Sequence, residues 1–136
     1  MATTSNKSVA TRLAIRPGDS VYVVGARGKH EALLGRLTPG SRIVEKEELP
    51  ADRVVVFAAN SGDLDRLLPA AIEATKLEGA LWVAYPKLTS GQSDLSRQVI
   101  HDSLRLSDWK PIAQISIDDV WSAVRARPVT KADRRA

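Results

Sequence analysis

The sequence predicts a single α/β domain: a mostly parallel sheet with flanking helices that ends in a C-terminal antiparallel hairpin. Apolar runs of strand length alternate with segments of helical periodicity, which is typical of parallel α/β architecture. The chain has 136 residues, 43% of them hydrophobic, and this size suits one hydrophobic core rather than two. We therefore divide it into a flexible N-terminal segment (1–12), an α/β domain (13–127) and a disordered basic tail (128–136).

Six apolar segments are expected to form the sheet. The first four are expected at about residues 20–25, 42–45, 53–58 and 80–86. The first of them has continuous Val and Tyr content, which fits a strand buried on both faces. The last two lie in KPIAQISIDDVWSAVRARP and join tightly at Asp118–Asp119, so they must be antiparallel, because a two-residue link cannot make a parallel crossover. Turn chemistry accounts for these two aspartates better than a catalytic carboxylate pair does.

The first two helices are expected on either side of the strand at 53–58. The stretch KHEALLGRL predicts a short helix. The stretch NSGDLDRLLPAAIEATKLEGA predicts a longer one that begins at an Asn60 or Ser61 cap and that Gly79 can terminate. Pro69 lies inside it and removes a backbone hydrogen bond, so we expect a kink, or a short turn followed by the helix proper.

The third helix is expected at residues 93–106, with Ser93 as its cap. Its apolar residues fall on two sides, with one stripe formed by Leu95, Val99 and Leu106 and the opposite one by Ile100 and Leu104. One sheet cannot bury both sides. The second stripe is therefore expected to contact the terminal hairpin, the N-terminal segment or another subunit.

Composition excludes several classes of protein. The chain has no cysteine and two histidines, so it has no disulfide, no thiolate metal site and no cysteine nucleophile, and we expect no metal. Its net charge of +4 comes from the two ends, residues 1–16 and 128–136, and basic residues are not interleaved with aromatic ones; we expect no nucleic-acid partner. No apolar run reaches the roughly 20 residues that span a bilayer, so we expect a cytoplasmic protein without a membrane partner.

Three segments resemble a known fold family. IRPGDSVYVVGARG is similar to the LKPGDRVLDVGCGTG segment that opens class I S-adenosylmethionine-dependent methyltransferases, ATKLEGALWVAYP is similar to their LKPGGRLVV segment, and ISIDDVWSAVRAR stands in the place of their final hairpin. The resemblance is closer to short bacterial proteins of unknown function with a methyltransferase-like fold, which share LWVAYPK, SDLSR and DDVWSAVR segments. It implies a shortened, Rossmann-like, methyltransferase-like architecture and leaves the activity open.

The turn after the first strand departs from the cofactor-binding pattern. Val23 stands where that family has an acidic residue, and Arg27 and Lys29 stand where its second and third glycines would fall if Gly25 is the first. Those glycines let the backbone approach the cofactor closely. We therefore expect no cofactor and no S-adenosylmethionine binding. Glu45 is placed to replace the ribose-binding acid, although a solvated acidic loop explains it better.

Any ligand is expected at the carboxyl edge of the sheet, where the loops after parallel strands meet and helix N-termini favour anions. The ligand-binding candidates are Gly25, Arg27, Gly28, Lys29, Lys87, Ser90, Asp94 and Arg97. The competing interpretation is structural: a tight basic turn, and a surface pair of Asp94 and Arg97 on one helix face. His101 shares that face, but no nucleophile matches it, so no residue is assigned a catalytic role.

These observations favour a non-catalytic Rossmann-like binding or regulatory domain with a degenerate cofactor turn. It would act through an unidentified protein partner or by self-association. The alternative is a small-molecule binder, either of an anionic ligand or of S-adenosylmethionine, including a divergent methyltransferase. The residues therefore favour a non-enzymatic role.

Overall fold

The computed structural model describes residues 9–25, 34–35, 37–87, 94–130 and 132–133. The helical elements are α1 (Val9–Arg12), a 3-10 turn η1 (Lys46–Glu48), α3 (Ser61–Ala74) and α4 (Arg97–Leu106). The strands are β1 (Ser20–Val24), β2 (Arg42–Ile43), β3 (Ala51–Phe57), β4 (Thr75–Pro86), β5 (Trp109–Ser116) and β6 (Trp121–Pro128). In these regions no helix is both long enough and apolar enough to cross a membrane.

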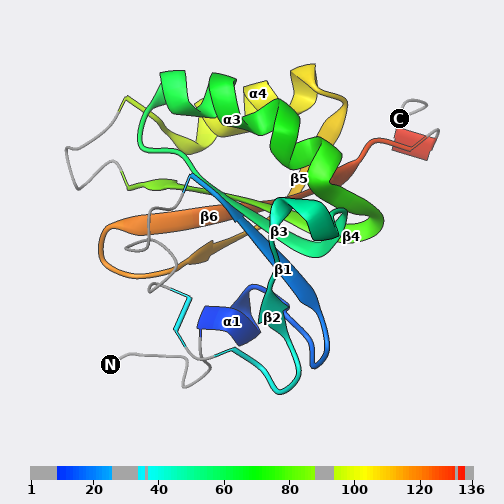
Figure 1. Ribbon diagram of the computed structural model, residues 1–136. Helices are drawn as coiled ribbons and strands as arrows, with labels where there is room; N and C mark the ends of the chain where they lie inside the picture. Colours follow the sequence, from blue (N-terminus) through cyan, green and yellow to red (C-terminus); the bar gives the residue numbers. More distant parts are fainter. Residues whose placement is uncertain (1–8, 26–33, 36, 88–93, 131, 134–136) are drawn as a thin grey trace.

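The six strands form one sheet in the order β2-β1-β3-β4-β6-β5. The first four pair in parallel, and β6 runs antiparallel between β4 and β5. Helices α3 and α4 cover one face of the sheet and α1 lies on the other (Figure 1). This confirms the predicted fold class, a mostly parallel sheet that ends in an antiparallel hairpin.

Alternate residues of the central strand β3 point into two separate cores. Val54 and Val56 pack on the side of α3 and α4, whereas Val55 and Phe57 pack on the side of α1. None of the four is more than 1% exposed. β3 is therefore the strand that is buried on both faces. Burial on both faces was predicted for β1, but β1 is half-buried along most of its length because its outer neighbour β2 has only two residues.

Helix α3 begins at the predicted cap, since the Asn60 side chain accepts a hydrogen bond from the backbone N–H of Asp63 at 2.9 Å. The helix is continuous through Pro69, so the expected short turn before it is wrong. Gly79 does not terminate the helix, which ends at Ala74 and passes directly into β4. A Cβ atom on Gly79 would lie 2.5 Å from the carbonyl oxygen of Asp52, so the glycine allows close approach of β3 and β4 instead.

Helix α4 starts later than predicted, because the side chain of Ser96, not that of Ser93, accepts the capping hydrogen bond. Ser93 lies outside the described residues. The stripe of Ile100 and Leu104 is the one that the sheet buries completely, while Leu106 from the opposite stripe is 89% exposed. The helix predicted from KHEALLGRL lies mostly outside the described residues.

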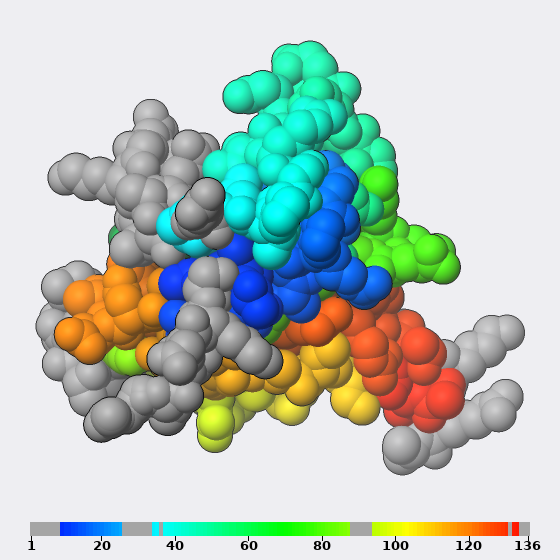
Figure 2. Space-filling view, turned by 90° about the horizontal axis from the view of Figure 1, so that it is seen from below, coloured from blue at the N-terminus to red at the C-terminus, as the bar shows by residue number. Residues whose placement is uncertain are grey.

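The folded domain extends further at both ends than the boundaries drawn from the sequence. Ala10 of α1 is fully buried, and the guanidinium of Arg12 donates to the carbonyl oxygens of Ser116 and Ile117 after β5. Seen from the α1 side, the dark blue residues of α1 lie against the orange turn of the hairpin formed by β5 and β6 (Figure 2). Residues 9–12 are therefore part of the domain, contrary to the expected flexible segment.

Beyond β6, the described residues contact the sheet as well. The backbone N–H of Val129 donates to the carbonyl oxygen of Asp108 at 2.9 Å. The Asp133 carboxylate accepts from Arg127 at 2.8 Å and from Lys110 at 3.2 Å. A detached tail would not make these contacts, so the described part of the C-terminal segment is joined to the domain.

Candidate functional site

The carboxyl edge of the sheet is where the sequence predicts a ligand. Four of the eight predicted residues, Arg27, Gly28, Lys29 and Ser90, lie outside the described residues. The other four, Gly25, Lys87, Asp94 and Arg97, do lie at this edge, just beyond β1 and β4 and at the start of α4. The ligand site itself stays a prediction.

Gly25 lies at the topological switch point between β1 and β3, where open α/β sheets have their binding crevice. Its φ is +80°, and a Cβ atom there would lie 2.4 Å from the carbonyl oxygen of Phe57 and 2.9 Å from Cδ1 of Leu67. A larger side chain here would collide with atoms of this same chain, and this is why the position requires glycine. The end of β1 therefore lies directly against the end of β3 at this point.

The N-terminus of α3 also faces this edge, and the protein's own carboxylates occupy it. Asp94 accepts from the backbone N–H of Ser61 at 2.9 Å and from its hydroxyl at 2.6 Å. These bonds to Ser61 lower the pKa of the Asp94 carboxyl. Asp63 accepts from the backbone N–H of Ala59 at 3.1 Å. Within the first turn of α3, the N–H groups of Ser61 and Asp63 are thus already bonded to side chains of this chain.

The predicted pairing of Asp94 with Arg97 is wrong, because Asp94 precedes α4 and bonds to α3 instead; no ion pair joins the two among the described residues. Lys87 is directed to the hairpin, since its ammonium donates to the hydroxyl of Ser116 at 2.6 Å. Arg97 lies near Tyr85, whose pKa is raised by burial and partly lowered again by the Arg97 charge. The side chains of Lys87, Asp94 and Arg97, all predicted to bind a ligand, thus each have different neighbours from the other two.

The interpretation of Asp118 as a turn residue between the last two strands is confirmed, while that of Asp119 stays a prediction. Oδ1 of Asp118 accepts from the backbone N–H groups of Val120 at 2.8 Å and Trp121 at 2.7 Å. This carboxylate therefore closes the turn of the hairpin.

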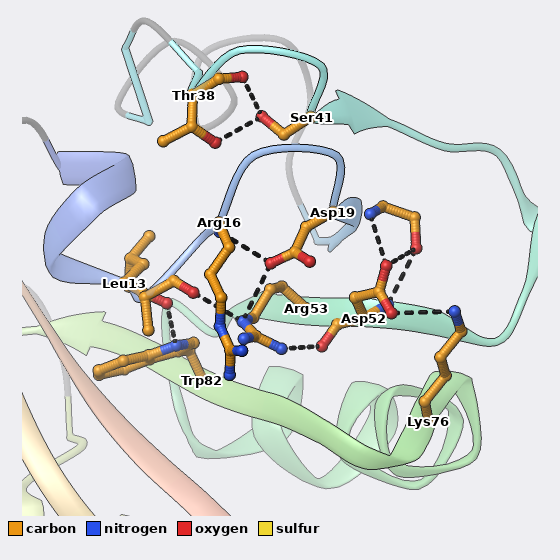
Figure 3. A network of polar contacts seen from close by, with 11 residues as sticks. Leu13, Arg16, Asp19, Thr38, Ser41, Asp52, Arg53, Lys76 and Trp82 are labelled. Carbon is orange, nitrogen blue, oxygen red and sulfur yellow. Dashed lines mark hydrogen bonds and ion pairs between the residues drawn. The ribbon is translucent and has the colours of Figure 1, made fainter.

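A second cluster, which sequence reasoning missed, lies at the opposite, amino-terminal edge of the sheet (Figure 3). A cavity of about 510 Å³ opens there, and we call it the amino-edge cavity. Its lining residues come from the loop before β1, the start of β3 and the start of β4: Arg16, Asp19, Asp52, Arg53, Lys76, Leu77, Glu78 and Gly79. Three cationic and three anionic side chains therefore surround one cavity.

Arg53 is the buried member of this cluster, with 4% of its surface exposed. Its Nε donates to the carbonyl oxygen of Ala14 at 2.8 Å and its Nη1 to that of Asp52 at 2.7 Å. The Asp19 carboxylate lies 3.5 Å from Nε. Burial lowers the Arg53 pKa, Asp19 opposes this effect, and the positive charges of Arg16 and Arg125 lower the pKa further.

Asp52 holds the start of β3 against its neighbours. Its carboxylate accepts from the backbone N–H of Ser20 at 2.9 Å, from the hydroxyl of Ser20 at 3.1 Å and from the ammonium of Lys76 at 2.9 Å. These hydrogen bonds lower the pKa of Asp52 to about 2, and the bond from the Ser20 backbone N–H has the largest effect. The carboxylate is therefore charged at neutral pH and connects β1, β3 and β4.

The lining of the amino-edge cavity combines guanidinium, ammonium and carboxylate groups and includes no histidine, serine or cysteine. Among the described residues no group of His, Asp and Glu side chains could hold a metal ion. One sequence signal for this site was Arg53, a charged residue at the start of the most apolar strand.

No protein-family model matches this chain, and no curated protein matches it. Among solved structures it is similar to a precorrin-6y C5,15-methyltransferase from Geobacter metallireducens, with a TM-score of 0.59 and 13% identity over 93% of each chain. It is similar to a ribosomal protein L11 methylase from Lactobacillus delbrueckii subsp. bulgaricus, with a TM-score of 0.56 and 11% identity over 90% of this chain and 75% of that one.

The tRNA methyltransferase TrmK of B. subtilis is a further similar structure, with a TM-score of 0.53 and 12% identity over 95% of this chain and 72% of that one. At these identities the similarity concerns the fold alone. The chain has the Rossmann-like fold of the class I S-adenosylmethionine-dependent methyltransferases, as the resemblance of the sequence implied.

Proposed function

We propose that this chain is a non-catalytic binding domain that has the methyltransferase fold but does not use S-adenosylmethionine. The observation that carries the proposal is the contact at Gly25. At the switch point, where the fold's ligands bind, the end of β1 lies against the Phe57 carbonyl and the Leu67 side chain of the same chain. Val23 reinforces the argument, because an apolar residue replaces the acid that the family has there.

The carboxylates at this edge support a role without proton transfer. Asp63 and Asp94 both accept hydrogen bonds from backbone N–H groups at the start of α3. The bonds from Ser61 lower the pKa of the Asp94 carboxyl and so make that carboxylate a weaker base. The two groups therefore act as helix-capping groups rather than as a catalytic pair.

Isothermal titration of the full chain with S-adenosylmethionine and with S-adenosylhomocysteine tests this proposal. We expect no saturable heat with either compound at about 1 mM. At this concentration, only a binding free energy less favourable than about −4 kcal/mol would escape detection. The unfolding midpoint is expected to stay constant, whereas a ligand at 100 times its Kd would raise stability by about 2.7 kcal/mol. Saturation in the micromolar range would contradict the proposal.

A divergent methyltransferase is the second candidate, and the position of Glu45 favours it. This residue is exposed and follows β2 by two positions, at the carboxyl edge, where the resemblance places a ribose-binding acid. If S-adenosylmethionine does bind, Glu45→Gln would weaken it about tenfold or more, as expected for loss of a charged hydrogen bond. Glu47→Gln is the matched control, since Glu47 is an exposed glutamate in the adjoining turn η1.

A further inference from the structure

We propose that a groove beside the terminal hairpin binds a small amphipathic carboxylate, with the carboxylate on Arg125 and the apolar body against Leu77 and Ile112. The groove has a volume of about 400 Å³, and we call it the hairpin groove. Its lining residues come from the start of β4, from β5, and from β6 with the segment after it: Leu77, Glu78, Gly79, Ile112, Arg125, Ala126, Arg127, Pro128 and Thr130.

The hairpin groove lies next to the amino-edge cavity, and residues 77–79 line both. In Figure 2, which views the α1 side of the sheet, the green start of β4 lies beside the red-orange end of β6. Both segments are at the end of the sheet opposite to the edge where the fold's cofactor binds. The inference is therefore independent of the proposed function at the carboxyl edge.

Two exposed apolar side chains form the apolar wall of the groove. The described residues include three exposed large hydrophobic side chains, and two of these, Leu77 at 83% and Ile112 at 45%, line the hairpin groove. Ile112 is the extra residue of a β-bulge, since the register of β5 with β6 passes from Pro111 to Ala113. An apolar group placed in the groove would remove both side chains from water, which favours its binding.

Arg125 is the unpaired cation of the groove. It is half-buried, and it makes no ion pair or side-chain hydrogen bond with any described residue. The second arginine in the lining, Arg127, is already bonded to the Asp133 carboxylate at 2.8 and 3.1 Å. In the sheet, Arg125 stands between Trp82 of β4 and the exposed Ala113 of β5, whose methyl group covers little of a long side chain.

An unpaired guanidinium beside an apolar wall favours a ligand with a single negative charge and an apolar body. The planar guanidinium fork binds a carboxylate through two parallel hydrogen bonds. Glu78 is an exposed carboxylate in the same lining, so it would repel an anion of higher charge, such as a phosphate monoester, more strongly. A volume of about 400 Å³ suits a body of one ring or one short chain.

The free edge of β5 disfavours an extended peptide as the occupant. This strand is outermost in the sheet and pairs with β6 alone. Its outer edge is interrupted by Pro111, which has no backbone N–H, by the bulge at Ile112, and by the exposed Lys110. Edge strands avoid pairing with other chains through such features. The groove therefore fits a small molecule better than an added strand.

An NMR titration of the isotope-labelled full chain with phenylbutyrate tests the proposal. We expect saturable shifts of the backbone amide signals of Gly79, Ile112 and Ala126, with a Kd below about 1 mM. Phenylbutyramide has the same body without the charge, and acetate has the charge without the body. Each is expected to bind about tenfold or more weakly, because each lacks one of the two interactions.

Two variants assign these interactions to residues. Arg125→Gln is expected to weaken phenylbutyrate about tenfold or more and to leave phenylbutyramide unchanged, because the amide compound does not use the charge. Leu77→Ser is expected to weaken both compounds by a similar factor, about fivefold, because it removes apolar contact. Leu77 is so exposed that its replacement leaves the packing intact, so this variant tests the groove even if Arg125→Gln unfolds.

The matched controls are Arg105→Gln and Leu106→Ser. Both residues are exposed in the last turn of α4, whereas the register of Arg125 with Trp82 places the groove's cation on the α1 side of the sheet. Figure 1 shows α4 on the opposite face. We expect both variants to bind phenylbutyrate with wild-type affinity. The unfolding midpoint of every variant is measured alongside its affinity.

Three results would overturn the inference. One is the absence of saturable shifts with phenylbutyrate up to about 10 mM. Another is binding of phenylbutyramide as tight as that of phenylbutyrate in the wild type. The third is a loss of affinity in Arg105→Gln or Leu106→Ser as large as in the groove variants. Binding of S-adenosylmethionine would contradict the proposed function and leave this inference intact.

Discussion

At the scale of single residues, Asp52 shows how one carboxylate joins three strands. It accepts two bonds from Ser20 of β1 and one from Lys76 at the start of β4. We predict that Asp52→Asn lowers the free energy of unfolding at pH 7 by about 1–3 kcal/mol, because an amide cannot accept these bonds as an anion does. Urea denaturation measures the change. Asp65→Asn, at an exposed position of α3, serves as the control and should change stability by less than about 0.5 kcal/mol.

The pH dependence of this difference follows from the pKa of Asp52. Hydrogen bonding lowers this pKa from 3.8 in the unfolded chain to about 2 in the folded protein. The stabilisation is therefore fully present above the unfolded value and is lost as the pH falls through the folded value. The stability gap between wild type and Asp52→Asn should stay constant above about pH 5 and close between about pH 4 and pH 2. A gap that persists unchanged at pH 2 would contradict this assignment.

Site residues were predictable where their partners are close in sequence. Asp118 bonds to residues two and three positions later, so turn chemistry identified it correctly. Asp94 bonds to Ser61, 33 positions away, and local helical spacing paired it wrongly with Arg97. The charged residues of the amino-edge cavity come from the loop before β1, the start of β3 and the start of β4, and only the folded sheet brings these segments together.

At the scale of elements, the strands were predicted well and the helix boundaries less well. Continuous Val-rich runs identify buried strands directly, as in β3. The cap of α4 was ambiguous because Ser93 and Ser96 are both chemically suitable. Gly79 was interpreted as the end of a helix because glycine commonly has that role. The structure shows another reason for a glycine at this position, which is the close approach of the Asp52 carbonyl from the neighbouring strand.

The segment after β6 gives a prediction at this scale. Its Asp133 bonds to Arg127 of β6 and to Lys110 of β5. A chain truncated after Pro128 is therefore expected to unfold a few degrees lower than the full chain, because the hairpin loses a link between its two strands. Truncation after Asp133 is the control and should leave the thermal midpoint unchanged. Equal midpoints for the two truncated chains would show that these bonds do not stabilise the hairpin.

At the scale of the whole molecule, each face of the sheet has its own core. Helices α3 and α4 extend over one face, and on the other face the four-residue helix α1 contributes to the core that the described residues form. We predict that a chain beginning at residue 13 loses about 2 kcal/mol or more of stability, since it lacks the buried Ala10 and the Arg12 bonds to the hairpin. A chain beginning at residue 9 keeps these contacts and should match the full chain in urea denaturation. If both chains are equally stable, α1 does not hold this face.

The position of β6 has a consequence for how the molecule comes into being. This strand is the last of the six in the chain, yet it lies inside the sheet, between β4 and β5. While a ribosome is still synthesising the preceding residues, the outer edge of β4 has no neighbour, and β5 has no strand to pair with. The nascent chain thus carries an open edge, the kind that other chains pair with during aggregation, until β6 has been synthesised. Insertion of β6 closes the sheet in one late step, so the strand order gives this small domain a folding sequence that is completed from its C-terminal end.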